Sequence, residues 1–231
     1  MMVAFMAFID AQARAGRKIE MIGPLAQSPA NYLSRMGFRD LLGDLGIAHG
    51  LPQVRSDASL ESTALVSVSR FAGQDEAAAM VEMIDYHALP APLGDVLCRA
   101  LLETANNVPE HAQVECGYMA AQVVDKGRTL RVSVADAGVG LLATLAKTGA
   151  GSDIEAVRMA VAGTSETGDP ARGRGLSSVR SALKENNGVG FLLSGQSILT
   201  MKPDQDSPWS YNIGYPGTVF DARIEVPSKT S

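Results

Sequence analysis

Three polar side chains recur at four-residue intervals in the stretch ALLETANNVPEHA, residues 100–112. On an α-helix, Glu103, Asn107 and His111 would lie along one stripe, because four residues advance about 400° around the axis. A carboxylate and an amide oxygen on adjacent turns suit a Mg²⁺ ion that keeps several waters and takes its other ligands from phosphates. The alternative is a solvated polar face whose spacing arose by chance.

A proline interrupts this stretch. Inside a helix a proline costs roughly 3 kcal/mol, so Pro109 predicts that the helix ends or kinks near Val108. The break leaves the first two polar residues on a regular helix and places His111 beyond it. The apolar residues expected to face the core are Leu97, Ala100, Leu101, Ala105 and Val108.

A second group of residues follows an apolar stretch in VSVADAGVGLL, residues 132–142. Gly138, Gly140 and Ala143 fit the G-x-G-x-x-A fingerprint of a dinucleotide site, but the charge of Asp136 would then lie beside the pyrophosphate. In a different interpretation, Asp136 itself binds the ligand by accepting a hydrogen bond from an exocyclic amine, and the glycines allow close backbone approach. A structural Asp-Gly-type turn after a strand is the third alternative.

The third group is the glycine-rich stretch GDPARGRGLSSVRSAL. Gly173 and Gly175 precede a helix expected to start near Leu176. The backbone amides and the dipole at a helix N-terminus favour a phosphate, and Arg172 and Arg174 would add countercharge. A glycine loop with solvated arginines is the alternative.

Taken in order, these three groups resemble the N, G1 and G2 boxes of the GHKL ATPases. That superfamily includes gyrase-type topoisomerases, mismatch-repair ATPases, histidine kinases and bacterial anti-sigma-factor serine kinases. The stretch GTVF, residues 217–220, resembles the closing strand of that fold, so the resemblance covers roughly residues 62–228. It implies a Bergerat-type ATP-binding fold, an α/β sandwich with helices on one face of a mixed sheet, preceded by a small incomplete α/β segment.

The resemblance also implies a role for each motif residue. Asn107 would ligate a Mg²⁺ ion that bridges the phosphates of ATP, and Glu103 would be the general base for water or a substrate hydroxyl. Asp136 would bind the adenine amino group, with Thr218 beside it, and residues 141–172 would form an ATP lid. The other positions assigned to nucleotide binding are His111, Gly138, Gly140, Arg172, Gly173, Arg174, Gly175 and Leu176.

The composition argues against several classes of protein. The chain has 231 residues and a net charge of −5, so it lacks the basic footprint of a nucleic-acid or anionic-membrane binder. Cys98 and Cys116 fit neither a disulfide framework nor a zinc pattern, which predicts reduced cysteines in a cytosolic protein. The apolar start MMVAFMAFID is too short to span a bilayer and lacks a basic region, so it predicts a buried helix rather than a signal or an anchor.

The periodicity predicts a helix over 2–15, a strand over 18–22 and a helical stretch over 28–46, with Ser28 as N-cap, Pro29 at the first helical position and Gly37 as an interruption. The polar stretch 48–62 lacks periodicity. Further helices are expected at 74–88, 92–108, 152–162 and 176–186, and strands at 64–71, 116–124, 129–136, 189–194, 197–202 and 218–226. The expected organisation is a STAS-like segment at 1–50, a linker at 51–62 and a GHKL ATP-binding domain at 63–231.

Residues 1–50 resemble the back half of a STAS-like domain, the fold of anti-sigma antagonists. No catalytic-lysine domain follows the ATPase motifs and no phosphoacceptor-histidine hairpin precedes them, so the chain most resembles the anti-sigma-factor serine kinases. We therefore expect an ATP-binding regulatory protein, a serine kinase or ATP-gated switch acting on a STAS-like or sigma-factor-like partner, with a homodimer allowed. A non-catalytic nucleotide-binding scaffold and a dinucleotide enzyme built on Gly138 stay open.

Overall fold

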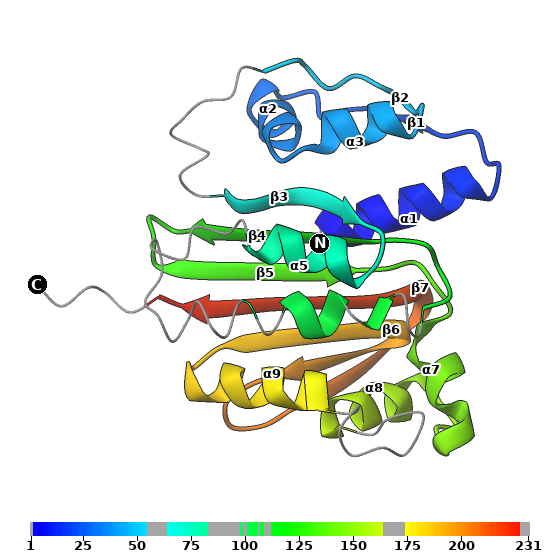
Figure 1. Cartoon of the computed structure of the whole chain (residues 1–231), viewed down its shortest axis with the longest axis vertical. Coiled ribbons are helices and arrows are strands. Elements are labelled where there is room, and N and C mark those ends of the chain that lie inside the picture. Colours follow the sequence, from blue (N-terminus) through cyan, green and yellow to red (C-terminus); the bar gives the residue numbers. More distant parts are fainter. Residues whose placement is uncertain are drawn as a thin grey trace, which may run out of the picture.

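A five-stranded antiparallel sheet, seen here in a computed structural model of the chain, organises the fold (Figure 1). The structure describes residues 2–54, 64–82, 98, 101–105, 107–108, 112–163 and 174–226. The strand order is β3-β4-β5-β7-β6. The strands are β3 (Ala64–Phe71), β4 (Gly117–Val124), β5 (Thr129–Ala135), β6 (Val189–Met201) and β7 (Ser207–Glu225). The expectation of a mixed sheet was wrong, because hairpins join β4 to β5 and β6 to β7 and so force antiparallel pairing.

The predicted strands at 64–71, 116–124 and 129–136 are confirmed to within a residue at each end. The two strands expected at 189–194 and 197–202 are one continuous strand, β6, because the chain passes through a register shift near Gly195 without leaving the sheet. The last strand, β7, begins at Ser207 rather than at residue 218.

Helices cover one face of the sheet: α5 (Gln74–Glu82), α7 (Gly140–Leu145) with the 3-10 turn η2 (Ala146–Thr148), α8 (Asp153–Ala162) and α9 (Arg174–Glu185) (Figure 1). The described helical residues 101–105 and 107–108, here called the 101–108 helix, join them. The predicted core face of this helix is confirmed for Leu101, Ala105 and Val108, which are buried with the inward residues of the strands. Leu97 and Ala100 lie outside the residues whose side chains are described.

The N-terminal segment contains α1 (Met2–Arg14), β1 (Glu20–Met21), α2 (Gln27–Arg35), α3 (Phe38–Asp44) and β2 (Ala48–His49). β1 pairs in parallel with β2, so the partner of the predicted strand lies inside the stretch 48–62 that was expected to be irregular. The N-cap of α2 is Ala26, so the assignment of Ser28 as N-cap was wrong. Gly37 takes a left-handed φ of +87° and separates α2 from α3, as predicted.

The second face of the sheet is covered by α1, so the helices do not lie on one face only (Figure 1). Alternation along β4 explains this arrangement, because successive side chains of a strand point to opposite faces. Tyr118 and Ala120 belong to the core formed with α1, whereas Met119 and Ala121 belong to the other core. The N-terminal segment thus packs directly on the sheet, although the predicted boundary places the two in different domains.

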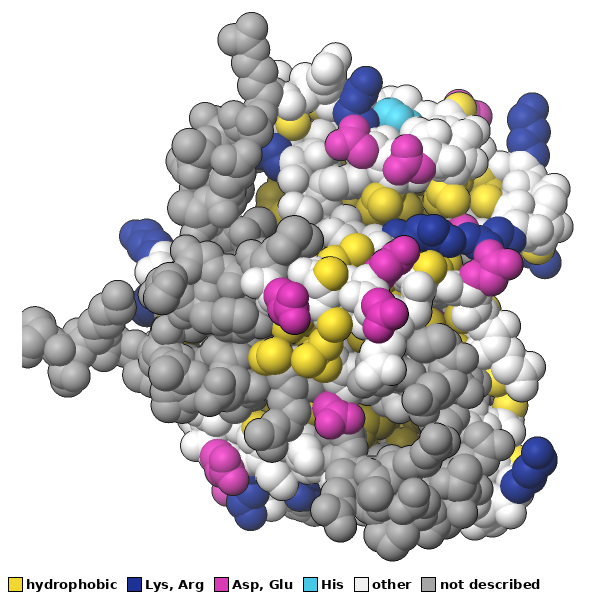
Figure 2. Space-filling model, viewed as in Figure 1, with side chains coloured by type: hydrophobic (Ala, Val, Ile, Leu, Met, Phe, Trp, Pro, Cys, Tyr) yellow, Lys and Arg dark blue, Asp and Glu magenta, His cyan; other side chains and the backbone are white. Residues whose placement is uncertain are grey.

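The described part of the chain contains no helix with the length and apolar character needed to cross a membrane. On the face drawn in Figure 2, acidic and basic side chains of the described residues are interspersed. This face therefore carries no broad patch of one sign, in keeping with the small net charge of −5.

Candidate functional site

Asp136 follows β5 directly and is only 5% exposed. Its backbone N–H donates to the carbonyl oxygen of Thr218 at 3.0 Å. Its side-chain Oδ1 accepts from the backbone N–H groups of Gly138, at 2.8 Å, and Thr218, at 3.3 Å. Its second oxygen, Oδ2, makes no hydrogen bond to a described residue. The carboxylate is therefore oriented through one oxygen and keeps acceptor capacity on the other.

Burial raises the pKa of the Asp136 carboxyl to about 6, and the hydrogen bonds from Gly138 and Thr218 oppose that rise. Burial penalises the charged form of an acid, and two backbone donors do not fully compensate here. The group is still mostly ionised at neutral pH. A buried acid with a raised pKa and an unused oxygen is a candidate for ligand binding.

Two glycines make room around this carboxylate. At Gly217, φ is +91° and a Cβ would lie 2.4 Å from the carbonyl oxygen of Asp136 and 2.6 Å from its Oδ1. At Gly138, a Cβ would lie 1.9 Å from the carbonyl oxygen of Ala112, which accepts from the N–H of Val139 at 3.0 Å. The close approach predicted for the glycine motif thus occurs within the protein's own backbone, which shapes the walls around Asp136.

Ser194 of β6 is a member of this site that the sequence analysis missed. It is 2% exposed. Its hydroxyl accepts from the N–H of Leu141 at 2.8 Å and donates to the carbonyl of Gly217 at 2.9 Å. The available signal was a serine at a core-facing position of an apolar strand, two residues after the buried Leu192.

Of the predicted site residues, the structure brings together Asp136, Gly138, Gly140 and Thr218. Gly140 begins α7 with a left-handed φ of +76°. The roles of these residues in nucleotide binding stay predictions.

Glu103 and Asn107 are half-buried on the 101–108 helix. Residue Ala112, which follows this helix, forms a wall of the Asp136 site through its contact with the Gly138–Val139 backbone. Pro109 and His111 lie outside the described residues, so the break at the proline stays a prediction.

The phosphate-binding group is only partly described. Helix α9 begins at Arg174, earlier than the predicted start near Leu176. The side chain of Leu176 is 8% exposed and belongs to the core, so this residue could meet a phosphate only through its backbone. Arg172 and Gly173 lie outside the described residues, and so does the side chain of Arg174.

The predicted lid at 141–172 lies partly within the described residues. Its first part forms α7, η2 and α8, and Ala156, Val157 and Val161 of α8 are buried in the core. Helix α8 confirms the helix predicted at 152–162, and the role of this segment as a lid stays a prediction. Residues 164–172 of the predicted lid lie outside the described part of the chain.

The dinucleotide interpretation of Gly138 and Gly140 lacks its structural context. A Rossmann site needs a parallel βαβ unit, in which the glycine turn joins a strand to a long helix. Both neighbours of β5 are antiparallel to it, and α7 has six residues. The glycines therefore belong to a tight turn around Asp136.

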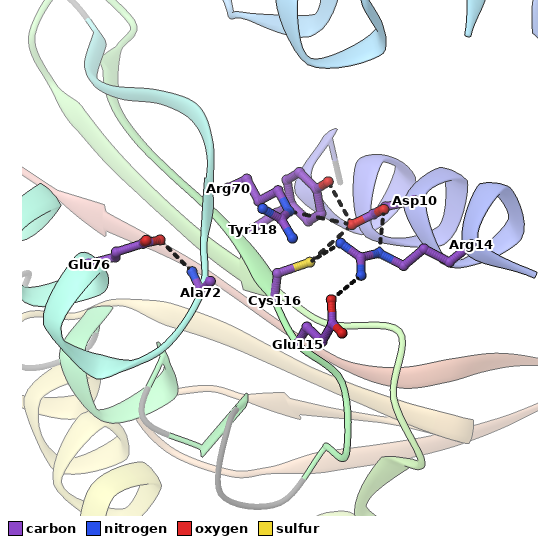
Figure 3. Close-up of polar contacts among 8 residues, drawn as sticks. All are labelled: Asp10, Arg14, Arg70, Ala72, Glu76, Glu115, Cys116 and Tyr118. Carbon is purple, nitrogen blue, oxygen red and sulfur yellow. Dashed lines mark hydrogen bonds and ion pairs between the residues drawn. The ribbon is translucent and has the colours of Figure 1, made fainter. Parts of the chain in front are cut away.

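A second buried carboxylate lies between α1 and the sheet (Figure 3). Asp10 of α1 is 2% exposed and accepts from Arg14 Nε at 2.8 Å, Cys116 Sγ at 3.0 Å and the Tyr118 hydroxyl at 3.0 Å. Arg70 Nε lies 3.8 Å from the same carboxylate. We call these five residues the Asp10 cluster. Nothing in the sequence spacing indicated it, since its members come from three distant segments.

The Asp10 cluster has no reactive group. Burial alone raises the pKa of Asp10, but hydrogen bonds from Cys116, Arg14 and Tyr118 outweigh it and bring that pKa below its ordinary value. Burial, together with the neighbouring Asp10, raises the pKa of the Cys116 thiol to about 11. The thiol is protonated at neutral pH and therefore a poor nucleophile. Cys98 and Cys116 are both free, as predicted.

Two further features of the described residues bear on ligand binding. A cavity of about 240 Å³ lies between α1, α2 and the sheet and is lined by Met2, Tyr32, Gln122, Arg131 and Asp221, among others. None of its lining residues belongs to the Asp136 site. No group of three or more His, Cys, Asp or Glu among the described residues is placed to hold a metal ion.

No protein-family model matches the chain, and no curated protein matches its sequence. The assignment of a function therefore rests on the motifs and on the geometry around Asp136.

Proposed function

We propose that the chain is an ATP-binding regulatory protein of the GHKL type, acting as a serine kinase or an ATP-gated switch on a protein partner. One observation carries the proposal. The buried carboxylate of Asp136 is held through Oδ1 by the N–H groups of Gly138 and Thr218, while Oδ2 has no partner among the described residues. The motif residue thus has the chemistry that adenine recognition requires.

The chemistry of this carboxylate favours adenine over guanine. Oδ2 of Asp136 can accept a hydrogen bond from the exocyclic amine of adenine, whereas guanine presents a carbonyl oxygen there and would be repelled. Burial strengthens both effects, because charges interact more strongly away from water. With a pKa of about 6, the group is in its accepting form at neutral pH.

The residues assigned to phosphate and metal binding fit a magnesium nucleotide. Mg²⁺ keeps several waters and binds through one or two protein groups plus phosphates. A bound Mg²⁺ would supply countercharge for the phosphates. Asn107 would offer an amide oxygen to that ion, and Glu103 would accept the proton of the attacking water or hydroxyl. The backbone amides in the first turn of α9 would face a phosphate.

The finer fold assignment is part of this proposal. We propose that the sheet with α5, the 101–108 helix, α8 and α9 on one face is a Bergerat-type sandwich, and that residues 1–50 are STAS-like. On that basis the partner is a STAS-like or sigma-factor-like regulator, and a homodimer is compatible with it.

Thermal unfolding with ATP or NAD, each with and without Mg²⁺, tests the nucleotide assignment. Native protein should be stabilised by about 2.7 kcal/mol when ATP is a hundredfold above its Kd, and NAD should have no such effect. Asp136→Asn should lose the ATP effect, because an amide nitrogen can then face the adenine amine. Asp125→Asn, in the exposed turn between β4 and β5, is the matched control and should respond as the native chain does. No stabilisation of the native chain at millimolar ATP with Mg²⁺ would refute the assignment.

Turnover separates an enzyme from a non-catalytic scaffold. Glu103→Gln keeps the shape of the side chain but removes the base, so ATP hydrolysis or phosphotransfer should fall by about 10²- to 10⁴-fold while ATP binding is retained. Equal turnover in the native chain and the variant would leave the nucleotide site as a scaffold or switch without Glu103 chemistry.

A further inference from the structure

Ser194 of β6 lies where this strand meets β7 and the start of α7. Its hydroxyl accepts from the N–H of Leu141 at 2.8 Å and donates to the carbonyl of Gly217 at 2.9 Å. At 2% exposure it has little access to water. Both functions of the hydroxyl are thus used within the protein, one on each of two segments.

Those two segments carry the two donors that orient Asp136. Gly138, which donates to Oδ1 at 2.8 Å, lies three residues before Leu141 in the turn that leads into α7. Thr218, which donates at 3.3 Å, directly follows Gly217 on β7. Ser194 therefore holds a close neighbour of each donor.

Gly140 and Gly217 have no side chain, and this leaves just enough space for the Ser194 hydroxyl and the Asp136 carboxylate. A Cβ at Gly140 would lie 2.9 Å from the Ser194 hydroxyl oxygen, and a Cβ at Gly217 would lie 2.6 Å from Asp136 Oδ1. Both glycines take left-handed φ values, +76° and +91°, which bring their backbones into these contacts. A single hydroxyl can donate and accept at once, which neither alanine nor a purely donating group can do.

We propose that Ser194 is the positioning residue of the adenine site: its hydroxyl ties the Gly138 turn to the Gly217–Thr218 strand and so aims the free oxygen of Asp136 at the exocyclic amine of the base. This inference rests on the proposed ATP function. Without the hydroxyl, the two donors move independently and the carboxylate loses its fixed direction. The expected loss is in selectivity for the amine, while binding through the phosphates is retained.

The experiment measures Kd for ATP and for ITP, each with Mg²⁺, because ITP differs at the base by a carbonyl in place of the amine. For the native chain we expect ATP to bind more tightly than ITP. In Ser194→Ala this preference should fall by about tenfold, the worth of one good hydrogen bond, through weaker ATP binding, while the Kd for ITP changes little. Ser197→Ala is the matched control: Ser197 is on the same strand, is also 2% exposed, and lies 3.3 Å from the hydroxyl of Ser210 instead.

An unchanged ATP-to-ITP ratio in Ser194→Ala, or an equal loss for both nucleotides, would overturn the inference and leave Ser194 a structural residue. Amide hydrogen exchange on the native chain gives a readout that does not depend on the variant folding. ATP should slow exchange at the amides of Leu141 and Thr218 more than saturating ITP does. Equal protection by the two nucleotides would also overturn the inference.

The same measurements distinguish a failure of the Ser194 proposal from a failure of the proposed ATP-binding function. Binding of neither nucleotide to the native chain would refute the proposed function. Equal affinity of the native chain for ATP and ITP would leave nucleotide binding standing but remove recognition of the amine by Asp136, and the role of Ser194 with it.

Discussion

Asp10 and Asp136 are both buried carboxylates, yet their surroundings differ in kind. Asp10 uses both oxygens: Oδ1 accepts from Arg14, and Oδ2 accepts from Cys116 and Tyr118. Asp136 uses only Oδ1, and its donors are two backbone N–H groups. The first carboxylate has cations beside it, and the second has none among the described residues.

The pKa values follow from this difference. Burial raises the pKa of both groups. For Asp10 the hydrogen bonds and Arg14 outweigh burial, and the pKa ends below its ordinary value. For Asp136 burial prevails, and the pKa is about 6. A buried acid that the protein itself satisfies is structural, whereas one left partly unsatisfied has capacity for a ligand.

The two carboxylates lie near the same end of the sheet, one on α1 and the other directly after β5. Tyr118, which donates to Asp10, is the register partner of Ala135, the residue before Asp136. On the neighbouring strand, the Tyr215 hydroxyl donates to the carbonyl of Ala4 in α1 at 3.0 Å. Helix α1 therefore braces the strands that carry the candidate site.

The largest effect should come from Asp10→Asn. Removing the charge takes the buried carboxylate away from Arg14 and Arg70, although Arg14 keeps its ion pair with Glu115. It also replaces acceptor capacity with an amide nitrogen, so the free energy of unfolding at pH 7 should fall by about 3 kcal/mol. Arg14 is partly exposed and water can relieve some of the loss. Urea denaturation measures the change, with Asp44→Asn at the exposed end of α3 as control. A loss as small as that of the control would mean that the Asp10 cluster contributes little to stability.

Asp136→Asn should have the opposite sign. Because the pKa of Asp136 is raised from 3.8 to about 6, its ionisation costs stability, a cost absent below pH 3.8 and complete once the pH has risen through 6. As the pH rises from 4 to 7, the free energy of unfolding of the variant should therefore increase relative to that of the native chain, by at most about 3 kcal/mol. Unfolding curves at several pH values measure the difference. If the difference in unfolding free energy does not change with pH, the ionised Asp136 is stabilised by its surroundings as well as Asp10 is.

Gly217→Ala should be next in size, and Gly127→Ala provides a control with a similar backbone. The two glycines have φ values of +91° and +87°, so both variants incur the strain of a left-handed alanine, about 1 kcal/mol. Only at Gly217 would the added Cβ also meet Asp136, whereas nothing lies within 4 Å at Gly127. We expect Gly217→Ala to cost about 2 kcal/mol more than the control. If thermal unfolding shows equal losses of stability in the two variants, the backbone around Asp136 can move to accommodate the added methyl group.

Tyr215→Phe should have the smallest effect. It removes the hydrogen bond to the Ala4 carbonyl, and one such bond contributes about 1 kcal/mol. The exposed Tyr211 offers the control variant Tyr211→Phe, which should leave the unfolding free energy unchanged. If the two variants are equally stable, the hydrogen bond from Tyr215 to Ala4 does not contribute to holding α1 against the strands of the site.

Local sequence patterns were sufficient to predict much of the secondary structure. Alternation predicted β3, β4 and β5, and the helical period predicted α1 and α8, because these patterns depend on residues two to four apart. The Asp136 motif was also recognisable, since a strand, an acid and two glycines are adjacent in the chain. The α7 helix was missed, because its six residues span less than two turns and carry few periodic signals.

The sequence by itself therefore determined that an acid follows a strand before a glycine turn, and that the chain carries a set of nucleotide-type motifs. Only the tertiary structure decided which residues surround that acid. Thr218 reaches it because β7 pairs beside β5, and Ser194 reaches the same place because β6 pairs beside β7. The Asp10 cluster likewise forms only when α1 lies on the sheet. Such contacts join segments far apart in the chain, and no local period encodes the register in which distant strands meet.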